Sequence, residues 1–304
     1  KLLIYDYTFG VSPKLKDAIQ FEDKYWIADL NNGMIKGTST WNNSQVFSNS
    51  PYTDGCYRLD IQYGKVMLAS GGLTGNLHNN YFNGGVHVFN DETWTNVNSN
   101  SQANYPAEMW DVISVAINPN NIEQMAFGSY SIGGMSVMNN GEITESFNEF
   151  NSPLESQIGN NGTHIIPDMK YDDDGNLWVV NAGVNPLKML SKDGVWHSFS
   201  LGSSAKNKYP YRLIIDSKGN KWVAFNGAGI VVFNENGTYA DVSDDDLVSL
   251  STASGYGSLP SSTVMALAED IDGEVWIGTE TGLSVLYSAS TLFDGGYGDA
   301  DAQE

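Results

Sequence analysis

Short apolar runs separated by turn residues recur along the whole chain. Three times in the C-terminal half an apolar run ends at Asp, a Gly-containing turn follows, and a second run begins at Trp, at 172–178, 216–222 and 270–276. All three segments read D-x-x-G-x-x-W. No stretch shows the i, i+3, i+4 apolar spacing of a long helix. The pattern predicts antiparallel strands in repeated units.

Each residue type in the repeat has a structural purpose. The Asp side chain bonds backbone two residues further on, and Gly175, Gly219 and Gly273 supply the positive φ that a tight hairpin needs. A large aromatic side chain at the start of the next strand suits burial between neighbouring sheets. We therefore predict buried, structural roles for the tryptophans of the repeats: Trp26, Trp178, Trp222 and Trp276.

Weaker copies precede the three clear repeats. They contain strands at 25–28, 65–69 and 112–117, each followed by a second apolar run that Gly introduces. Outer fourth strands are expected at 41–47, 93–97, 143–147 and 195–199. The six copies predict an all-β fold, a single β-propeller of six four-stranded blades.

The two ends of the chain complete each other in this scheme. The last copy supplies three strands within 264–287, whereas residues 2–7 begin the chain as a strand without a blade of its own. We predict that this N-terminal strand joins the last blade and closes the ring, because closure removes exposed sheet edges. A seven-bladed ring is the alternative, if a degenerate copy lies in 48–55, 98–109 or 240–262.

Length and composition fit one domain in a longer protein. The repeats run through nearly all of the 304 residues, so residues 1–294 are expected to form the propeller. Residues 295–304 are polar and are expected to be a linker to a further domain. The chain begins at Lys1 in an apolar run without an initiator Met, and we interpret it as a segment cut from a longer chain.

The net charge narrows the range of partners. Fifteen Lys and Arg against 36 Asp and Glu give a formal charge of −21. Contacts to phosphate need clustered basic side chains, so nucleic acid and anionic lipid surfaces are excluded as partners. No apolar run approaches the roughly 20 residues of a membrane span, and no signal-peptide layout is present. We expect no direct membrane insertion.

The chain has no complete sequence motif for catalysis or metal binding. Cys56 is the only cysteine, which excludes a Cys-based metal site and a disulfide. The acidic segment 172–176 begins like a calcium loop, but its Gly comes before the Asn and no Glu stands at the twelfth position, so a hairpin is favoured. No G-x-S-x-G elbow is present, and we expect no enzyme activity, no metal and no cofactor. None of the histidines has the i+2 or i+4 spacing of a metal motif: His78, His87, His164 and His197.

One place in the repeat predicts a binding site. The starts of the innermost strands of all blades converge on one opening near the ring axis, here called the mouth. Arg holds a carboxylate or phosphate in a fork, and Trp or Tyr stacks on a sugar face. A structural interpretation stays open, in which Arg58 and Arg212 pair with aspartates and join neighbouring blades. The candidate residues at the mouth are Lys16, Arg58, Trp110, Asp111, His164, Asp168, Tyr211 and Arg212.

A second candidate surface is an insertion between two strands at 71–83, rich in Gly and Asn. Loops that carry polar and aromatic residues often bind ligands. The alternative is a disordered loop. Its candidate residues are His78, Asn79, Asn80 and Tyr81.

The last repeat carries a specific resemblance to known proteins. Residues 270–283 read D-I-D-G-E-V-W-I-G-T-E-T-G-L and resemble the two-component-regulator propeller repeat of periplasmic sensor regions in Bacteroidetes hybrid kinases. The segments 284–288 and 301–303 resemble the end of a propeller in PorZ-like proteins of the type IX (Por) secretion system. Upstream copies depart from the repeat, since Gln20 and Ile61 replace its Asp and Met67 replaces its Trp.

The resemblance implies a non-catalytic protein of the cell envelope, periplasmic or at the outer-membrane surface. PorZ-like proteins are associated with the surface complex that attaches secreted cargo to anionic lipopolysaccharide. The implied partners are an acidic envelope glycan, a protein of the secretion system and other domains of the same chain. The alternative is a ligand-sensing propeller of a hybrid two-component kinase, and an enzyme such as a propeller lyase is the third class.

Overall fold

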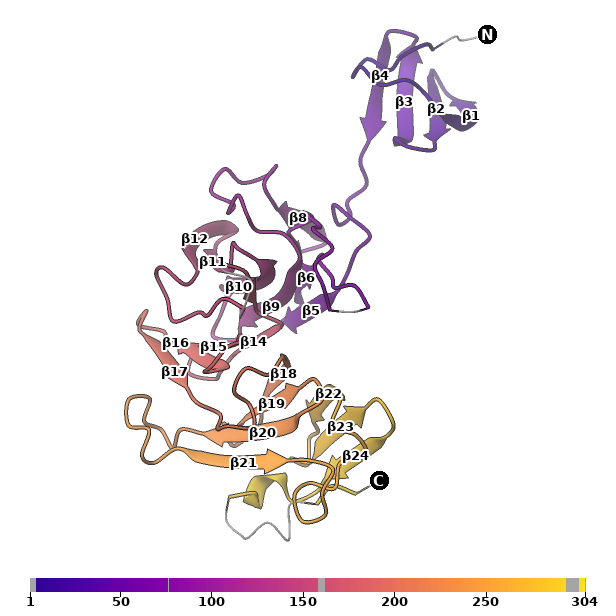
Figure 1. Cartoon of the computed structure of the whole chain (residues 1–304). Helices are drawn as coiled ribbons and strands as arrows, with labels where there is room; N and C mark the ends of the chain where they lie inside the picture. Colours follow the sequence, from indigo (N-terminus) through magenta and orange to yellow (C-terminus); the bar gives the residue numbers. More distant parts are fainter. Residues whose placement is uncertain (1–3, 76, 158–161, 294–300, 304) are drawn as a thin grey trace. The chain divides into compact units, whose positions relative to one another are not determined.

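The secondary structure is almost entirely antiparallel β-sheet (Figure 1), as the sequence pattern predicts. The structure is a computed structural model that describes residues 4–75, 77–157, 162–293 and 301–303. The chain divides into two compact units, residues 1–50 and residues 51–304. No helix within the described ranges is long and apolar enough to cross a membrane.

The first unit is one antiparallel sheet in the order β1-β2-β3-β4. Its core is small: Tyr7, Ile27 and Ile35 pack together, and the Tyr7 hydroxyl donates to Asp29 at 2.9 Å. The segment before β1 is therefore tied to this sheet by a buried aromatic side chain. The strands of the first unit are β1 (Leu15–Phe21), β2 (Lys24–Asp29), β3 (Gly33–Ser39) and β4 (Asn42–Val46).

The prediction of a strand at residues 2–7 is wrong for the part that the structure describes. Residues 4–7 form no strand, because the Tyr7 backbone N–H bonds to Val11 O at 2.8 Å and Gly10 N–H bonds back to Tyr7 O at 2.9 Å, which makes a turn. Residues 2 and 3 lie outside the described ranges. Closure of the ring stays a prediction.

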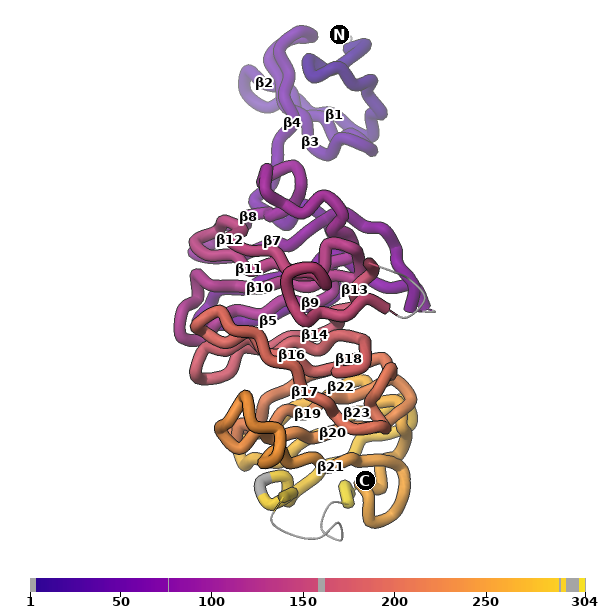
Figure 2. The backbone as a smooth tube through the Cα atoms, turned by 60° about the vertical axis from the view of Figure 1, so that its left-hand side comes forward, coloured from indigo at the N-terminus to yellow at the C-terminus, as the bar shows by residue number. Residues whose placement is uncertain are grey.

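The second unit contains five sheets, which follow one another in chain order (Figure 2). The first sheet consists of β5 (Arg58–Gln62), β6 (Lys65–Ala69), β7 (Val86–Asn90) and β8 (Thr93–Val97). The second consists of β9 (Val112–Asn118), β10 (Asn121–Ser131), β11 (Met135–Asn139), β12 (Glu142–Phe147) and β13 (His164–Ile165). The third consists of β14 (Asp168–Tyr171), β15 (Leu177–Val180), β16 (Leu187–Leu190) and β17 (Trp196–Phe199). The last two consist of β18 (Pro210–Ile215), β19 (Lys221–Phe225), β20 (Gly229–Asn234) and β21 (Asp246–Leu250); and β22 (Val264–Glu269), β23 (Val275–Thr279) and β24 (Leu283–Leu286).

The described residues therefore form six sheets, which matches the number of repeats. The outer strands β4, β8, β12 and β17 lie where the sequence predicts them. The outer strand β21 falls inside 240–262, one of the segments in which a seventh copy was considered, and it completes the fifth sheet instead. The described ranges hold no seventh sheet.

Apolar side chains fill the space between successive sheets of the second unit. Met67 and Val88 of one sheet pack with Val115 and Phe127 of the next, and similar clusters join each following pair. Each sheet is thus buried by its neighbours in the chain. This arrangement is typical of propeller blades.

The repeated Asp and Trp are partners in the structure. The indole Nε1–H of Trp178 donates to Asp172 Oδ2 at 2.8 Å, and the equivalent bonds in the other two repeats measure 2.8 and 2.7 Å. The other carboxylate oxygen, Oδ1, accepts backbone N–H groups of the hairpin. Gly175 adopts φ +86°, as the predicted turn requires. The acidic segment at 172–176 is therefore a hairpin whose carboxylate is already bonded.

Burial of the repeated tryptophans is confirmed for two of the three. Trp178 and Trp222 are 0% exposed, because each packs against the following sheet. Trp276 is 39% exposed, so the prediction of burial is wrong for this residue. It lies on the last sheet of the second unit, and no further sheet of that unit covers this face. Trp26, in the first unit, is half-buried.

The C-terminal residues pack on the last sheet. Gln303 and Val285 exchange two backbone hydrogen bonds of 2.8 Å, which places residue 303 beside the outer strand β24. The Asp301 carboxylate accepts N–H groups of Gly255 and Gly257 at 2.9 and 3.1 Å. Residues 301–303 therefore contact the fold, where the sequence suggests a polar linker.

Candidate functional site

The starts of three innermost strands lie together in the second unit. Arg58 begins β5, Asp168 begins β14 and Tyr211 lies at the start of β18. Arg58 Nη1 lies 3.5 Å from Asp168 Oδ2, and Nη2 donates to the Tyr211 carbonyl oxygen at 3.3 Å. Three strands from three different sheets are thus joined at the mouth.

Arg58 has the structural role that the sequence left open. Its side chain is only 12% exposed and that of Asp168 is 5% exposed, so the pair is largely withdrawn from water. Asp168 also accepts the Leu213 backbone N–H at 3.0 Å. The pair therefore joins the second, fourth and fifth sheets and forms the floor of the mouth.

Arg212 is the basic group nearer to solvent. Its guanidinium stacks on the Tyr211 ring, with Cζ 4.6 Å from the ring centroid, and its Nε–H donates to the Met265 carbonyl oxygen at 3.1 Å. A guanidinium over an aromatic face gains from the ring quadrupole. Within the described part of the chain Arg212 forms no ion pair. Its charge is available to a ligand.

Asp111 organises the insertion at 71–83. It is 0% exposed, has φ +45°, and its carboxylate accepts the backbone N–H groups of Asn80, Tyr81 and Phe82 at 2.8, 2.7 and 3.0 Å. The neighbouring Trp110 packs on the Tyr81 ring, with centroids 5.7 Å apart. The described part of the insertion is therefore a fixed structure and no disordered loop.

The remaining candidates are His164 and Lys16. His164 is buried, its Nε2 accepts the Glu149 backbone N–H at 3.1 Å, and burial lowers the pKa of its imidazole. It is therefore a neutral structural residue at neutral pH. Lys16 lies on β1 in the first unit and is exposed.

Loss of the Asp111 carboxylate should release the insertion. In Asp111→Ala the three N–H groups lose their acceptor, and a hydrogen bond to a charged group contributes about 1.5–3 kcal/mol. We expect about tenfold faster amide exchange, or more, at residues 80–82, measured by hydrogen exchange. Asp60→Ala is the control, because Asp60 bonds Ile117 N–H on another strand. Unchanged exchange at residues 80–82 would contradict the assignment.

A group of tyrosines surrounds the Arg58 floor and was missed by the sequence reasoning. Burial, and then the neighbouring Tyr211, raises the pKa of Tyr57 to about 12. Burial likewise raises the pKa of Tyr130 and Tyr209. All of these phenols are protonated at neutral pH. The Tyr130 hydroxyl has an acceptor among the described residues, whereas the Tyr209 hydroxyl is buried without one. Tyr57 directly precedes Arg58, so a search for residues at strand starts could have found it. Tyr130 lies near the far end of the long β10, where such a search does not look.

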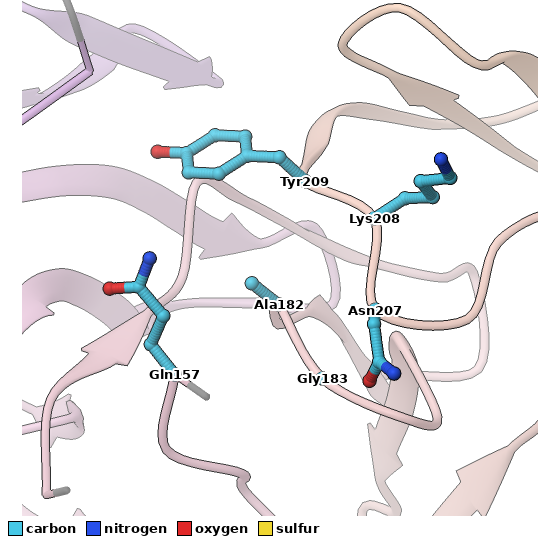
Figure 3. Close-up of a pocket in the computed structure, with 6 residues that line it drawn as sticks. All are labelled: Gln157, Ala182, Gly183, Asn207, Lys208 and Tyr209. Atoms are coloured by element: carbon cyan, nitrogen blue, oxygen red, sulfur yellow. The ribbon is translucent and has the colours of Figure 1, made fainter. Parts of the chain in front are cut away.

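The first cavity at the mouth, here called the tyrosine pocket, has a volume of about 260 Å³. Figure 3 shows the Tyr209 ring and the Gln157 amide facing the same space, with Asn207 on the other side and the Lys208 side chain extending away. Gln157 Oε1 accepts the Tyr130 hydroxyl at 3.2 Å, which leaves the amide nitrogen as a donor. The pocket is lined by Gln157, Ala182, Gly183, Asn207, Lys208 and Tyr209.

A buried ion pair holds one wall of the tyrosine pocket. Glu155 accepts the backbone N–H groups of Val184 and Asn185 at 2.5 and 2.9 Å, and the ammonium of Lys188 at 2.9 Å. Burial raises the pKa of Glu155, but Lys188 and the two N–H groups outweigh it and hold the pKa below its usual value. A Cβ on Gly183 would lie 2.6 Å from the Glu155 carboxylate, so the wall requires glycine.

The second cavity, here called the insertion pocket, has a volume of about 290 Å³. It lies between the insertion and the start of β22. Asn226, one of its lining residues, donates its backbone N–H to the Tyr209 carbonyl oxygen at 2.9 Å, so the two pockets are neighbours. The pocket is lined by Gly75, Leu77, Tyr211, Asn226, Thr263, Val264 and Met265.

The chemistry of the two pockets suits binding. No histidine, cysteine or carboxylate is among the described residues that line them, and their titratable side chains are those of Lys208, Tyr209 and Tyr211. Across the described ranges no three His, Cys, Asp or Glu side chains are grouped to hold a metal ion. An aromatic ring beside amide groups is suited to sugars.

The family and structure comparisons agree with the fold. A model of the two component regulator propeller repeat matches residues 258–281, which confirms the resemblance of the last repeat. None of the curated proteins compared matches the chain.

Three solved structures illustrate the similarity. PorZ of Porphyromonas gingivalis, described as an essential bacterial surface component of the type-IX secretion system, aligns with a TM-score of 0.75 at 22% identity, over 90% of this chain and 38% of PorZ. The extracellular domain of a putative hybrid two component system from B. thetaiotaomicron aligns with a TM-score of 0.50 at 14% identity, over 91% of this chain and 33% of that one. Virginiamycin B lyase from Staphylococcus aureus aligns with a TM-score of 0.51 at 13% identity, over 88% of this chain and 79% of the lyase. The chain thus shares the propeller fold and spans 38% of the length of PorZ.

Proposed function

We propose that the chain is a non-catalytic binding propeller of a bacterial cell-envelope protein related to PorZ, and that it holds an acidic glycan at the mouth. The tyrosine pocket carries this proposal. Tyr209 offers a ring for stacking, while Gln157 and Asn207 offer amides to sugar hydroxyls. Secretion-system proteins and further domains of the same chain are the other proposed partners.

The acidic character of the ligand follows from the charge distribution. A chain of net charge −21 repels anions in general, so it recognises one only where basic groups gather. Arg212, which has no ion pair within the described part of the chain, is the basic group assigned to the anion, whereas Lys208 borders the tyrosine pocket and extends its side chain away from it. Arg58, already paired with Asp168, supports the floor.

A ligand-sensing propeller of a hybrid two-component system is the second candidate. The two component regulator repeat at 258–281 and the similarity to a sensor extracellular domain favour it. The same mouth would then bind the signal molecule. A propeller lyase is the third candidate; the described lining residues include no histidine, cysteine or carboxylate, so its acid–base groups would be Lys208, Tyr209 or Tyr211.

Binding of envelope glycans to the purified chain, measured on an array and then by calorimetry, tests the proposal. The double variant Tyr209→Ala/Gln157→Ala should lose affinity by about tenfold or more, because stacking and a hydrogen bond together contribute about 1–3 kcal/mol. Tyr63→Ala is the matched control, since Tyr63 is 80% exposed at the opposite end of β5 from Arg58. Full binding by the double variant, or turnover of the glycan, would refute the proposal.

A further inference from the structure

The insertion pocket differs in chemistry from the tyrosine pocket. Leu77 and Met265 form an apolar wall, and the Tyr211 ring completes it, whereas Val264 is 1% exposed and packs in the core behind the pocket. Met265 is 45% exposed. The side-chain groups that offer polar atoms are those of Thr263 and Asn226 and the hydroxyl of Tyr211. A sugar hydroxyl placed against this wall loses its water without finding a partner, whereas a methyl group gains from burial.

The apolar wall is held in place before any ligand arrives. The Asp111 carboxylate fixes three backbone N–H groups of the insertion, and the Asn79 side-chain amide donates to the Tyr130 carbonyl oxygen at 2.5 Å. A turn closed by the Leu77 N–H on Thr74 O at 2.9 Å sets the position of Leu77. A preorganised wall costs less ordering entropy on binding than a mobile loop would.

The two pockets open on one continuous segment of chain. Tyr209 lines the tyrosine pocket and Tyr211 lines the insertion pocket. Arg212 stacks on Tyr211 and so places its charge beside the insertion pocket. One extended ligand therefore meets an aromatic and amide-lined cavity, an apolar cavity and a positive charge.

We propose that the insertion pocket is a second subsite, selective for a sugar unit that carries a methyl group, such as that of an N-acetyl group or of a 6-deoxy sugar. The proposal rests on the proposed function and specifies its ligand: an acidic oligosaccharide with a hydroxyl-rich unit in the tyrosine pocket and a methyl-bearing unit in the insertion pocket. The insertion at 71–83 is thereby assigned as the element that determines specificity.

The test compares two acidic oligosaccharides that are identical except at one position, where one member carries an N-acetyl group and the other a hydroxyl. The affinity of the whole chain for each member is measured by calorimetry. The wild-type chain should bind the N-acetylated member about tenfold more tightly. In Leu77→Gln/Met265→Gln the preference should fall to about one, because the methyl group loses its apolar contacts. Met34→Gln is the matched control, because Met34 is a similarly exposed methionine on β3 in the first unit, 51% exposed against 45% for Met265.

Failure of this inference differs from failure of the proposed function. Equal wild-type affinity for both members of a pair, or a preference that survives in the double variant, overturns the second subsite and leaves glycan binding at the mouth intact. Absence of binding by any glycan overturns both. A structure of a complex in which an aliphatic peptide side chain, and no sugar, fills the insertion pocket would also overturn the inference.

Discussion

Replacing Trp222 with Ala is expected to lower the free energy of unfolding by about 3–5 kcal/mol, the range for large aromatic truncations in a core. The side chain is 0% exposed and packs between the fifth and sixth sheets. The change also removes the donor to the buried Asp216 carboxylate, which the indole approaches at 2.8 Å. Chemical denaturation of the purified variant measures the effect, and stability equal to the wild type would contradict the assigned role.

Trp276 provides the matched comparison. It makes the same bond to the Asp of its own repeat, at 2.7 Å, but it is 39% exposed. Trp276→Ala is therefore expected to cost clearly less than Trp222→Ala. An equal cost would show that this face of the last sheet is covered in solution, as a closed ring requires.

The architecture was predictable because its signal is local. The D-x-x-G-x-x-W phrase specifies a hairpin and the aromatic side chain after it; three clear and three weaker copies correspond to the six sheets of the described residues. The bond between the Asp and the indole of Trp178 was missed, since the motif gives spacing and no contact geometry. Burial of Trp276 was wrongly predicted for a related reason. The local motif is the same in all three repeats, whereas exposure depends on which sheet follows.

The chain ends and the binding site were predictable only in part. The segment at 2–7 reads as a strand, but packing of Tyr7 on Ile27 overrides this local preference. The mouth was found from strand starts, and Arg58 and Tyr211 do meet there. Gln157 and Asn207 were missed, because they lie in loops without any repeating pattern and only the folded chain brings them together.

Removing the Glu155 carboxylate is the second change with a large expected effect. Lys188 is 0% exposed and its ammonium bonds Glu155 and the Asn185 carbonyl oxygen. In Glu155→Ala the buried charge loses its partner, and such changes typically cost about 3–5 kcal/mol. The double variant Glu155→Leu/Lys188→Met removes both charges and should recover most of that loss. Thermal and chemical unfolding measure both variants.

The same pair predicts an acid dependence of stability. The pKa of Glu155 is held below its usual value in the folded chain, so its contribution is fully present above the unfolded pKa of about 4.3. That contribution is lost as the pH falls through the folded pKa. Glu155→Gln should therefore show a smaller loss of stability than the wild type when the pH is lowered through this range. An identical pH profile for the two proteins would rule out this role of the carboxylate.

Glycan affinity should depend on the ion pair of Glu155 and Lys188, because Glu155 fixes the wall of the tyrosine pocket that contains Gly183. In Glu155→Ala the N–H groups of Val184 and Asn185 lose their acceptor, and the wall of the tyrosine pocket loses its support. We expect weaker binding even at temperatures where the variant is fully folded by circular dichroism. Lys65→Met is a suitable comparison, because Lys65 is buried and pairs with the partly exposed Glu123 outside both pockets. Equal affinity of folded Glu155→Ala and wild type would show that the pair stabilises the fold without positioning the pocket.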